Sequence, residues 1–193
     1  AMFHDINKYM QAMRTLAAEG NVAEVNQMMA ETQELFDSLT TVVDVGNSVV
    51  SVILNEYREI TEDADISFTF DVSVPQNLGI SAVDLYVLMG NTLDNAVEAC
   101  ASVPAEERYI RIQMRTYHNI LFYQIENPFA EGYPQRSRGK SHGYGLQNVR
   151  KCVEKHDGHM SVSQNDNKFV LSMRLNGCVP IDCQLLENTH LSV

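Results

Sequence analysis

A row of polar side chains runs through an otherwise apolar stretch of this chain. Asn91, Asn95 and Glu98 are spaced so that a helix would place all three on one line of its surface. Side-chain amides in a dry environment cost about 1–3 kcal/mol each when they lack partners. Phosphate oxygens and Mg²⁺ are suitable partners, because Mg²⁺ prefers oxygen ligands and an amide carbonyl is one. The alternative is a surface helix with two hydrated asparagines.

A second group of candidate residues lies downstream, where a helix is predicted to start near residue 146. The glycines at 143 and 145 would let the backbone approach phosphates at that helix N-terminus, where free N–H groups favour anions. The preceding loop, over residues 129–141, carries three cations that could neutralise a polyphosphate: Arg136, Arg138 and Lys140. An ordinary solvated loop is the alternative, and the sequence does not decide which cation would touch phosphate.

His4 and Asp5 lie at the start of the first predicted helix, which covers residues 3–18. A carboxylate bound to one imidazole nitrogen fixes the tautomer and leaves the other nitrogen available as a nucleophile. A solvated surface histidine is the alternative. Further apolar seams predict helices over residues 22–39 and 48–61, and burial of these seams favours a homodimeric helical bundle. The helices could instead pack only on their own chain.

After these helices, the sequence predicts five strands and the helix that carries the polar row. Alternating residues predict strands over 66–72, 109–117, 120–126, 160–163 and 169–173. The helix with the polar row should begin after Ser81 as its N-cap and stop before Pro104. Its buried face is predicted to comprise Leu85, Leu88, Thr92, Ala96, Ala99 and Cys100.

Composition limits the function classes. The chain has 193 residues and a formal net charge of -11, which argues against nucleic acid as a partner but not against a bound nucleotide. There is no signal peptide and no apolar run long enough to span a membrane. The four cysteines show no metal-binding spacing, and two of them, Cys100 and Cys152, fit buried reduced thiols. His156 and His159 are interpreted as a helix end and a turn rather than as metal ligands.

Together these motifs resemble the GHKL superfamily of gyrase-type ATPases and histidine kinases. The similarity is greatest to the sensor histidine kinases of two-component systems that include peptide-sensing receptors. Asn91-x-x-x-Asn95 resembles the N box, His4-Asp5 the H box and Gly143-x-Gly145-Leu146 the G2 box. The resemblance implies an α+β chain: a dimerising helical hairpin or bundle over residues 1–64, an α/β sandwich of the Bergerat ATP-binding type over 65–176, and a tail over 177–193.

The resemblance also implies roles for individual residues. His4 would accept the γ-phosphoryl group of ATP with help from Asp5, and Asn95 would ligate Mg²⁺. The residues expected to bind ATP are Asn91, Asn95, Glu98, Asn127, Lys140, His142, Gly143, Tyr144, Gly145 and Leu146. The implied partners are a second copy of the chain, the receiver domain of a response regulator and an upstream membrane sensor region. The chain is therefore expected to be a cytoplasmic fragment of a membrane-anchored bacterial receptor, and its start at Ala1-Met2 resembles a cloning remnant.

Several positions depart from the family pattern. Lys8 replaces the Asn or Thr associated with phosphatase activity, and the Asp-x-Gly-x-Gly box is missing, with Asn127 in the place of its Asp. Asn127 either contacts adenine or is a strand-end residue before a proline. Asn91 replaces the Glu that activates water in related ATPases, which favours transfer over hydrolysis, while Glu98 stands where many of these kinases carry a base. A protein-serine kinase of the same fold and a non-catalytic dimeric scaffold are the alternative functions.

Overall fold

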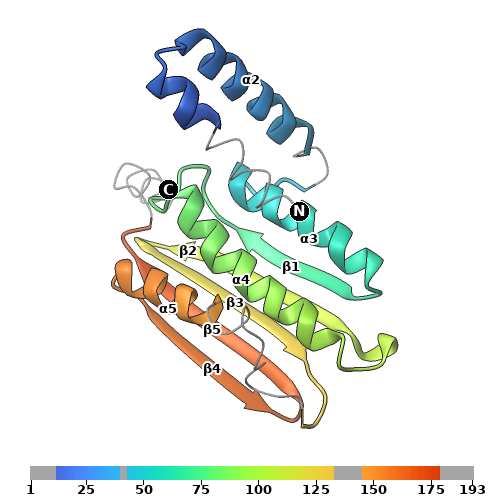
Figure 1. Cartoon of the computed structure of the whole chain (residues 1–193). Coiled ribbons are helices and arrows are strands. Elements are labelled where there is room, and N and C mark those ends of the chain that lie inside the picture. The colour runs from blue at the N-terminus through green and yellow to red at the C-terminus, as the bar shows by residue number, and fades with distance from the viewer. Residues whose placement is uncertain (1–11, 40–42, 133–144, 179–193) are drawn as a thin grey trace, which may run out of the picture. The chain divides into compact units, whose positions relative to one another are not determined.

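A computed structural model describes residues 12–39, 43–132 and 145–178 of the chain (Figure 1). The chain divides into two compact units, over residues 1–42 and 43–193. The described part of the first unit contains a helix over residues 12–18 and helix α2, Val22–Leu39. Asn21 lies between them, where its Oδ1 accepts a bond from the Glu24 N–H and its Nδ2 donates to the Glu24 carboxylate.

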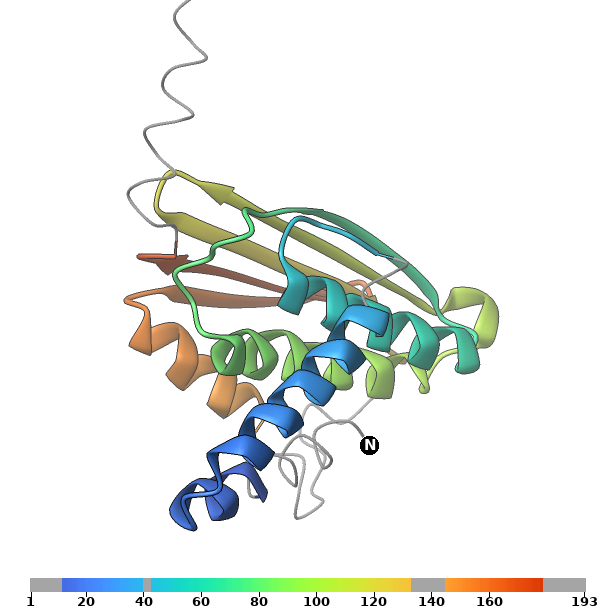
Figure 2. The same ribbon diagram turned by 90° about the horizontal axis from the view of Figure 1, so that it is seen from above.

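The second unit is a two-layer sandwich, which confirms the predicted α/β architecture. Its helices are α3 (Ser48–Asp63), α4 (Ala82–Cys100) and α5 (Gly145–Lys155), with a short 3₁₀ helix, η1 (Ala105–Glu107). Its strands are β1 (Ser67–Ser73), β2 (Tyr109–Tyr117), β3 (Ile120–Pro128), β4 (His159–Asn165) and β5 (Lys168–Asn176). Figures 1 and 2 show α3, α4 and α5 side by side over one face of the sheet.

The sheet has five strands in the order β1-β2-β3-β5-β4. β1 pairs with β2 in parallel, and every other pair is antiparallel. A tight turn at His118-Asn119 joins β2 to β3, and His118 has a positive φ of 51°. Alternate residues of the central strands face the helices and form the core, including Ile110, Ile112, Leu121, Ile125, Leu171 and Leu175.

Helix α4 lies across the middle of the sheet and buries the face that the sequence predicted. Leu85, Leu88, Thr92, Ala96, Ala99 and Cys100 are all less than 9% exposed. Thr92 meets the sheet through its hydroxyl, which lies 2.9 Å from the Tyr123 hydroxyl. One face of α4 is therefore buried against the sheet, and the other faces of the helix point away from the sheet.

Helix α3 belongs to the sandwich, although the sequence placed the domain boundary after it, at residue 64. The two compact units divide between Val42 and Val43 instead. The reason is that α3 buries Val50, Ile53 and Leu54 in the core shared with α4 and β1. Asn47 caps the helix by accepting a bond from the Val50 N–H, which fixes where α3 starts.

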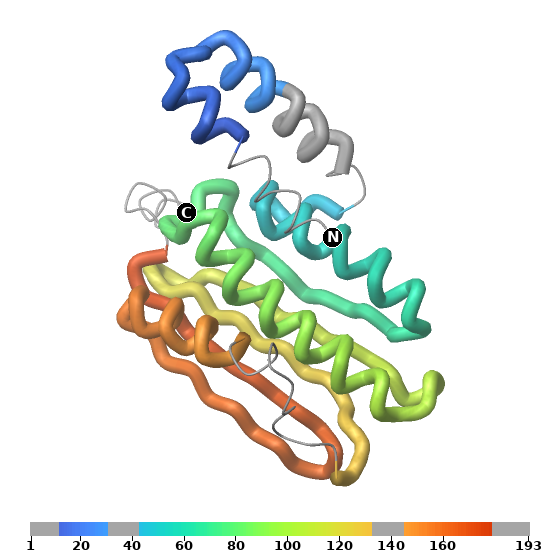
Figure 3. The backbone as a smooth tube through the Cα atoms, viewed as in Figure 1, coloured from blue at the N-terminus to red at the C-terminus, as the bar shows by residue number. Residues whose placement is uncertain are grey.

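Helix α5 ends at Lys155, and the turn that follows it contains a glycine, Gly158, with no room for a side chain. Figure 3 shows the backbone turning from α5 into β4. A Cβ at Gly158 would overlap the Arg174 carbonyl oxygen and lie 2.9 Å from the Val153 carbonyl oxygen. Both are backbone atoms within the sandwich, so they cannot move aside without displacing α5 or β5.

Gly158→Ala is therefore expected to lower the free energy of unfolding by about 2–4 kcal/mol, since the clash must be relieved by backbone movement. Urea unfolding followed by far-UV circular dichroism measures the change. Ser161→Ala, at an exposed position of β4, is the control and should change the free energy by less than about 0.5 kcal/mol. Equal stability of the two variants would contradict the close packing at Gly158.

Candidate nucleotide site

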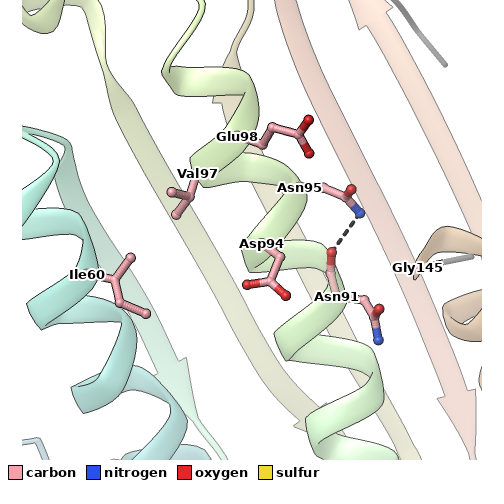
Figure 4. Close-up of a pocket in the computed structure, with 7 residues that line it drawn as sticks. All are labelled: Ile60, Asn91, Asp94, Asn95, Val97, Glu98 and Gly145. Atoms are coloured by element: carbon pink, nitrogen blue, oxygen red, sulfur yellow. Dashed lines mark hydrogen bonds between the residues drawn. The ribbon is translucent and has the colours of Figure 1, made fainter. Parts of the chain in front are cut away.

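A cavity of about 420 Å³ lies beside helix α4, on the side away from the sheet. Figure 4 shows the residues that line it: Ile60, Asn91, Asp94, Asn95, Val97, Glu98 and Gly145. They come from α3, α4 and the first residue of α5. The volume is in the range of small-molecule sites in proteins. The three residues of the predicted polar row thus share one cavity.

The two asparagines are oriented by the helix that carries them. Asn91 Nδ2 donates to the Val87 carbonyl at 2.7 Å, and Asn95 Nδ2 donates to the Asn91 carbonyl at 2.6 Å. Each amide group is therefore held by the helix through its NH₂ end. Among the described residues, neither Oδ1 atom accepts a hydrogen bond from another group. The carbonyl ends are thus suited to receive a metal ion or an external donor.

The start of α5 meets the polar row directly, although more than fifty residues separate them in the sequence. A Cβ on Gly145 would lie 3.1 Å from Asn91 Oδ1, so glycine permits this close approach. The first N–H groups of a helix lack partners within that helix and favour anions. The cavity therefore has amide and carboxylate oxygens on one wall and a helix N-terminus at its edge.

A second contact between α4 and α5 lies at the start of α4 and the end of α5. Asp84, at the start of α4, accepts hydrogen bonds from Lys155 Nζ at 2.8 and 3.1 Å and lies 3.0 Å from His156 Nε2. Burial alone would raise the pKa of Asp84, but the bonds from Lys155 and His156 outweigh it and lower the pKa to about 2. This contact fixes the antiparallel register of α4 and α5 and so places Gly145 beside Asn91.

Sequence reasoning missed one contact at this cavity. The Tyr57 hydroxyl donates to Asp94 Oδ1 at 2.6 Å and lies 3.1 Å from the Gly90 carbonyl oxygen. Burial, together with the bond to Asp94, raises the pKa of Tyr57, so the phenol stays protonated and donates. Tyr57 lies in the helix that the sequence predicts over residues 48–61, and no local pattern in the sequence indicates this contact. The contact ties α3 to the helix turn that carries Asn91 and Asn95.

Tyr57→Phe is expected to lower the free energy of unfolding by about 1 kcal/mol, because it removes these bonds and leaves the ring in place. Tyr117→Phe is the matched control, since Tyr117 is 66% exposed and should tolerate the change. Urea titration of both variants gives the comparison. If the two changes were equal, the hydroxyl of Tyr57 would contribute nothing to the packing of α3 on α4.

Only some of the remaining residues that the sequence predicted for the site lie at the cavity. Glu98 lines the cavity with the asparagines, but Asn127 does not. Asn127 is 2% exposed at the end of β3, and its Nδ2 donates to the Pro128 carbonyl at 2.9 Å. Leu146 packs against the core beside the cavity. The other predicted residues lie outside the described residues: His4, Asp5, Lys140, His142, Gly143 and Tyr144.

The residues present fit a divalent cation bound together with phosphate. Asn95 Oδ1 is an amide oxygen, and the carboxylates of Asp94 and Glu98 line the same cavity. Oxygen donors of this kind suit Mg²⁺, which commonly keeps several water ligands and binds substrate phosphates. The predicted roles of Asn91, Asn95, Glu98 and Gly145 in binding nucleotide stay predictions, while their position in one cavity is observed.

A two-layer sandwich whose central helix carries amides along a cavity is the architecture of a GHKL-type ATP-binding domain. The sequence profile of the GHKL domain family matches residues 80–176, half of the chain. The chain belongs to this family. The matched range begins just before α4 and ends with β5, so it includes the polar row and the start of α5. Membership of the family supports a kinase or ATPase role.

Solved structures show the same fold. The nucleotide-free catalytic domain of histidine kinase ThkA is 18% identical, with a TM-score of 0.52 over 67% of this chain and 91% of that chain. The histidine kinase AdeS of Acinetobacter baumannii is 12% identical, with a TM-score of 0.50 over 90% of this chain and 98% of that chain. At these identities the likeness establishes the fold alone. No curated protein sequence matches the chain.

The helices of the described residues do not have the properties of a membrane span. Within residues 12–39, 43–132 and 145–178, none combines the length and the apolar composition that crossing a bilayer requires.

Proposed function

We propose that this chain is the kinase fragment of a two-component sensor, which binds Mg-ATP, phosphorylates His4 and passes the phosphoryl group to an Asp of a response regulator. The observation that supports the proposal is the cavity shared by Asn91, Asn95 and Gly145, with the two amide oxygens available as ligands. Family membership supports the same reading, because it makes a kinase or ATPase role the expected one.

The chemistry at the cavity requires positioning and charge neutralisation more than covalent help from the protein. Asn95 Oδ1 would hold the metal ion, and Mg²⁺ would neutralise charge on the phosphate oxygens. Asn91 and the N-terminus of α5 would orient the phosphates. Because an amide cannot act as a base, Asn91 would leave water unactivated, and slow hydrolysis would favour transfer to a protein acceptor.

Transfer itself would use the helical unit of the chain. A neutral His4 ring nitrogen would attack the γ-phosphorus as the bond to the leaving oxygen breaks, which releases ADP. Asp5 would orient the ring and help to accept its proton. We propose a homodimer for the chain, with a membrane sensor region upstream and the described domains on the cytoplasmic side. The net charge of -11 agrees with a protein partner rather than nucleic acid.

Incubating the chain with γ-labelled ATP and Mg²⁺ tests the proposal and separates the alternatives. A phosphohistidine is labile to acid and stable to base, so the label should be lost in acid. A label that survives acid would instead indicate a protein-serine kinase of the same fold. Absence of Mg²⁺-dependent binding of a fluorescent ATP analogue would contradict the proposal and favour the alternative function, a non-catalytic dimeric scaffold.

A further inference from the structure

A cluster of potential metal ligands lies at the opposite end of α4 and α5 from the nucleotide cavity. It contains a carboxylate oxygen of Asp84, the sulfur of Cys152 and a ring nitrogen of His156, all within 4.8 Å of one another. Asp84 and Cys152 are buried, and the His156 side chain is 14% exposed. None of these residues lines the cavity beside Asn91. The cluster is therefore separate from the nucleotide cavity, and its contacts within the protein do not use the sulfur of Cys152 as a metal ligand would.

The donor types match a borderline transition metal. Zn²⁺ takes thiolate, imidazole and carboxylate ligands at about 2.0–2.3 Å in a tetrahedral arrangement, which puts neighbouring ligand atoms roughly 3.3–3.6 Å apart. His156 Nε2 already lies 3.0 Å from Asp84 Oδ2, close to that separation. The sulfur lies within 4.8 Å of both and can close the remaining gap by a small rotation. A hard cation such as Mg²⁺ would not select a sulfur ligand.

The group of ligand atoms contains three residues, so the fourth tetrahedral position is open to a water molecule. The sequence showed no metal-binding spacing, because the ligands come from the start of α4 and the end of α5, which lie far apart in the sequence. Only the folded sandwich brings them together.

A cation already occupies one side of the cluster. The Lys155 ammonium contacts both oxygens of Asp84, yet the Lys155 side chain is 63% exposed and can swing into solvent without unfolding α5. With Lys155 displaced and a proton released from the Cys152 thiol to solvent, one carboxylate and one thiolate would balance the charge of Zn²⁺. Lysine and metal would thus compete for Asp84.

We propose that Asp84, Cys152 and His156 form a zinc-binding site that pins the start of α4 to the end of α5, with Lys155 as the competing cation. The site does not depend on the proposed kinase activity. A metal there would hold α5 along α4, and α5 carries Gly145 at its other end.

Titration of the reduced, untagged chain with Co²⁺, followed by displacement with Zn²⁺, tests the site without any measurement of activity. Wild type should develop sulfur-to-cobalt charge-transfer absorption that Zn²⁺ removes. Cys152→Ser should lose this absorption, and His156→Gln should weaken the affinity at least about tenfold. Cys100→Ser removes a buried thiol outside the cluster and His159→Gln an exposed imidazole, so both should behave as wild type.

Lys155→Ala provides a test that does not remove a ligand. Because it removes the competing cation from an exposed position, it should keep the fold and raise metal affinity about tenfold. The site is disproved if wild type shows no charge-transfer absorption, if Cys152→Ser keeps it, or if Lys155→Ala leaves the affinity unchanged. The metal affinity of Lys155→Ala tests the site even if a variant that lacks a ligand fails to fold.

Discussion

Replacing Asn95 with alanine is expected to weaken binding of Mg-ATP at least about 100-fold and leave the sandwich folded. The variant removes the amide oxygen that we propose as the metal ligand. It also removes the hydrogen bond from Asn95 Nδ2 to the Asn91 carbonyl, which helps to fix the polar row. Alanine is a better helix former than asparagine, so α4 itself should persist. Titration with a fluorescent ATP analogue, with and without Mg²⁺, measures the loss.

Asn148→Ala is the matched control for this experiment. Asn148 is an exposed asparagine within α5 and does not line the cavity, so its loss should leave affinity near that of wild type. Circular dichroism of both variants checks that the helices remain. Should Asn95→Ala bind Mg-ATP as tightly as Asn148→Ala, the cavity beside α4 would not be the nucleotide site.

Replacing His4 with glutamine is expected to abolish acid-labile phosphorylation of the chain and leave nucleotide affinity unchanged. Glutamine keeps a polar side chain but has no nucleophilic ring nitrogen, so transfer would have no acceptor. His4 lies outside the described residues, and the expectation therefore rests on the resemblance of His4-Asp5 to an H box. Filter binding after incubation with γ-labelled ATP gives the phosphorylated fraction.

His159→Gln serves as the control, because His159 is an exposed histidine on β4, outside the cavity. It should incorporate label as wild type does. Retention of acid-labile label in His4→Gln would indicate that another histidine accepts the phosphoryl group. Retention of acid-stable label would favour a hydroxyl acceptor and the serine-kinase alternative.

Much of the sandwich could be predicted because its elements have strong local patterns. The burial of Leu85, Leu88 and Thr92 on one face of α4 follows from helical spacing, and the structure confirms it. The hairpin of β2 and β3 follows from alternation on both sides of His118-Asn119. Ser81 caps α4 as predicted, since its hydroxyl accepts a bond from the Asp84 N–H at 3.1 Å.

The placement of α3 could not be predicted in the same way. An apolar seam shows that a helix must bury one face, but it does not show which partner covers that face. The sequence analysis places the helix predicted over residues 48–61 in a dimerising bundle. The structure instead packs Ile53 and Tyr57 in the core of the sandwich, and the Tyr57 hydroxyl contacts Asp94.

By itself, the sequence determined which residues form α4 and which of its faces carries Asn91, Asn95 and Glu98, because helical period is a local property. Only the tertiary structure decided what lies opposite that face. The approach of Gly145 to Asn91 depends on how two antiparallel helices register on the sheet, and a contact between distant segments has no local signal. The same holds for Asp84, because η1, β2 and β3 lie in the sequence between α4 and the end of α5, where its partners Lys155 and His156 are found.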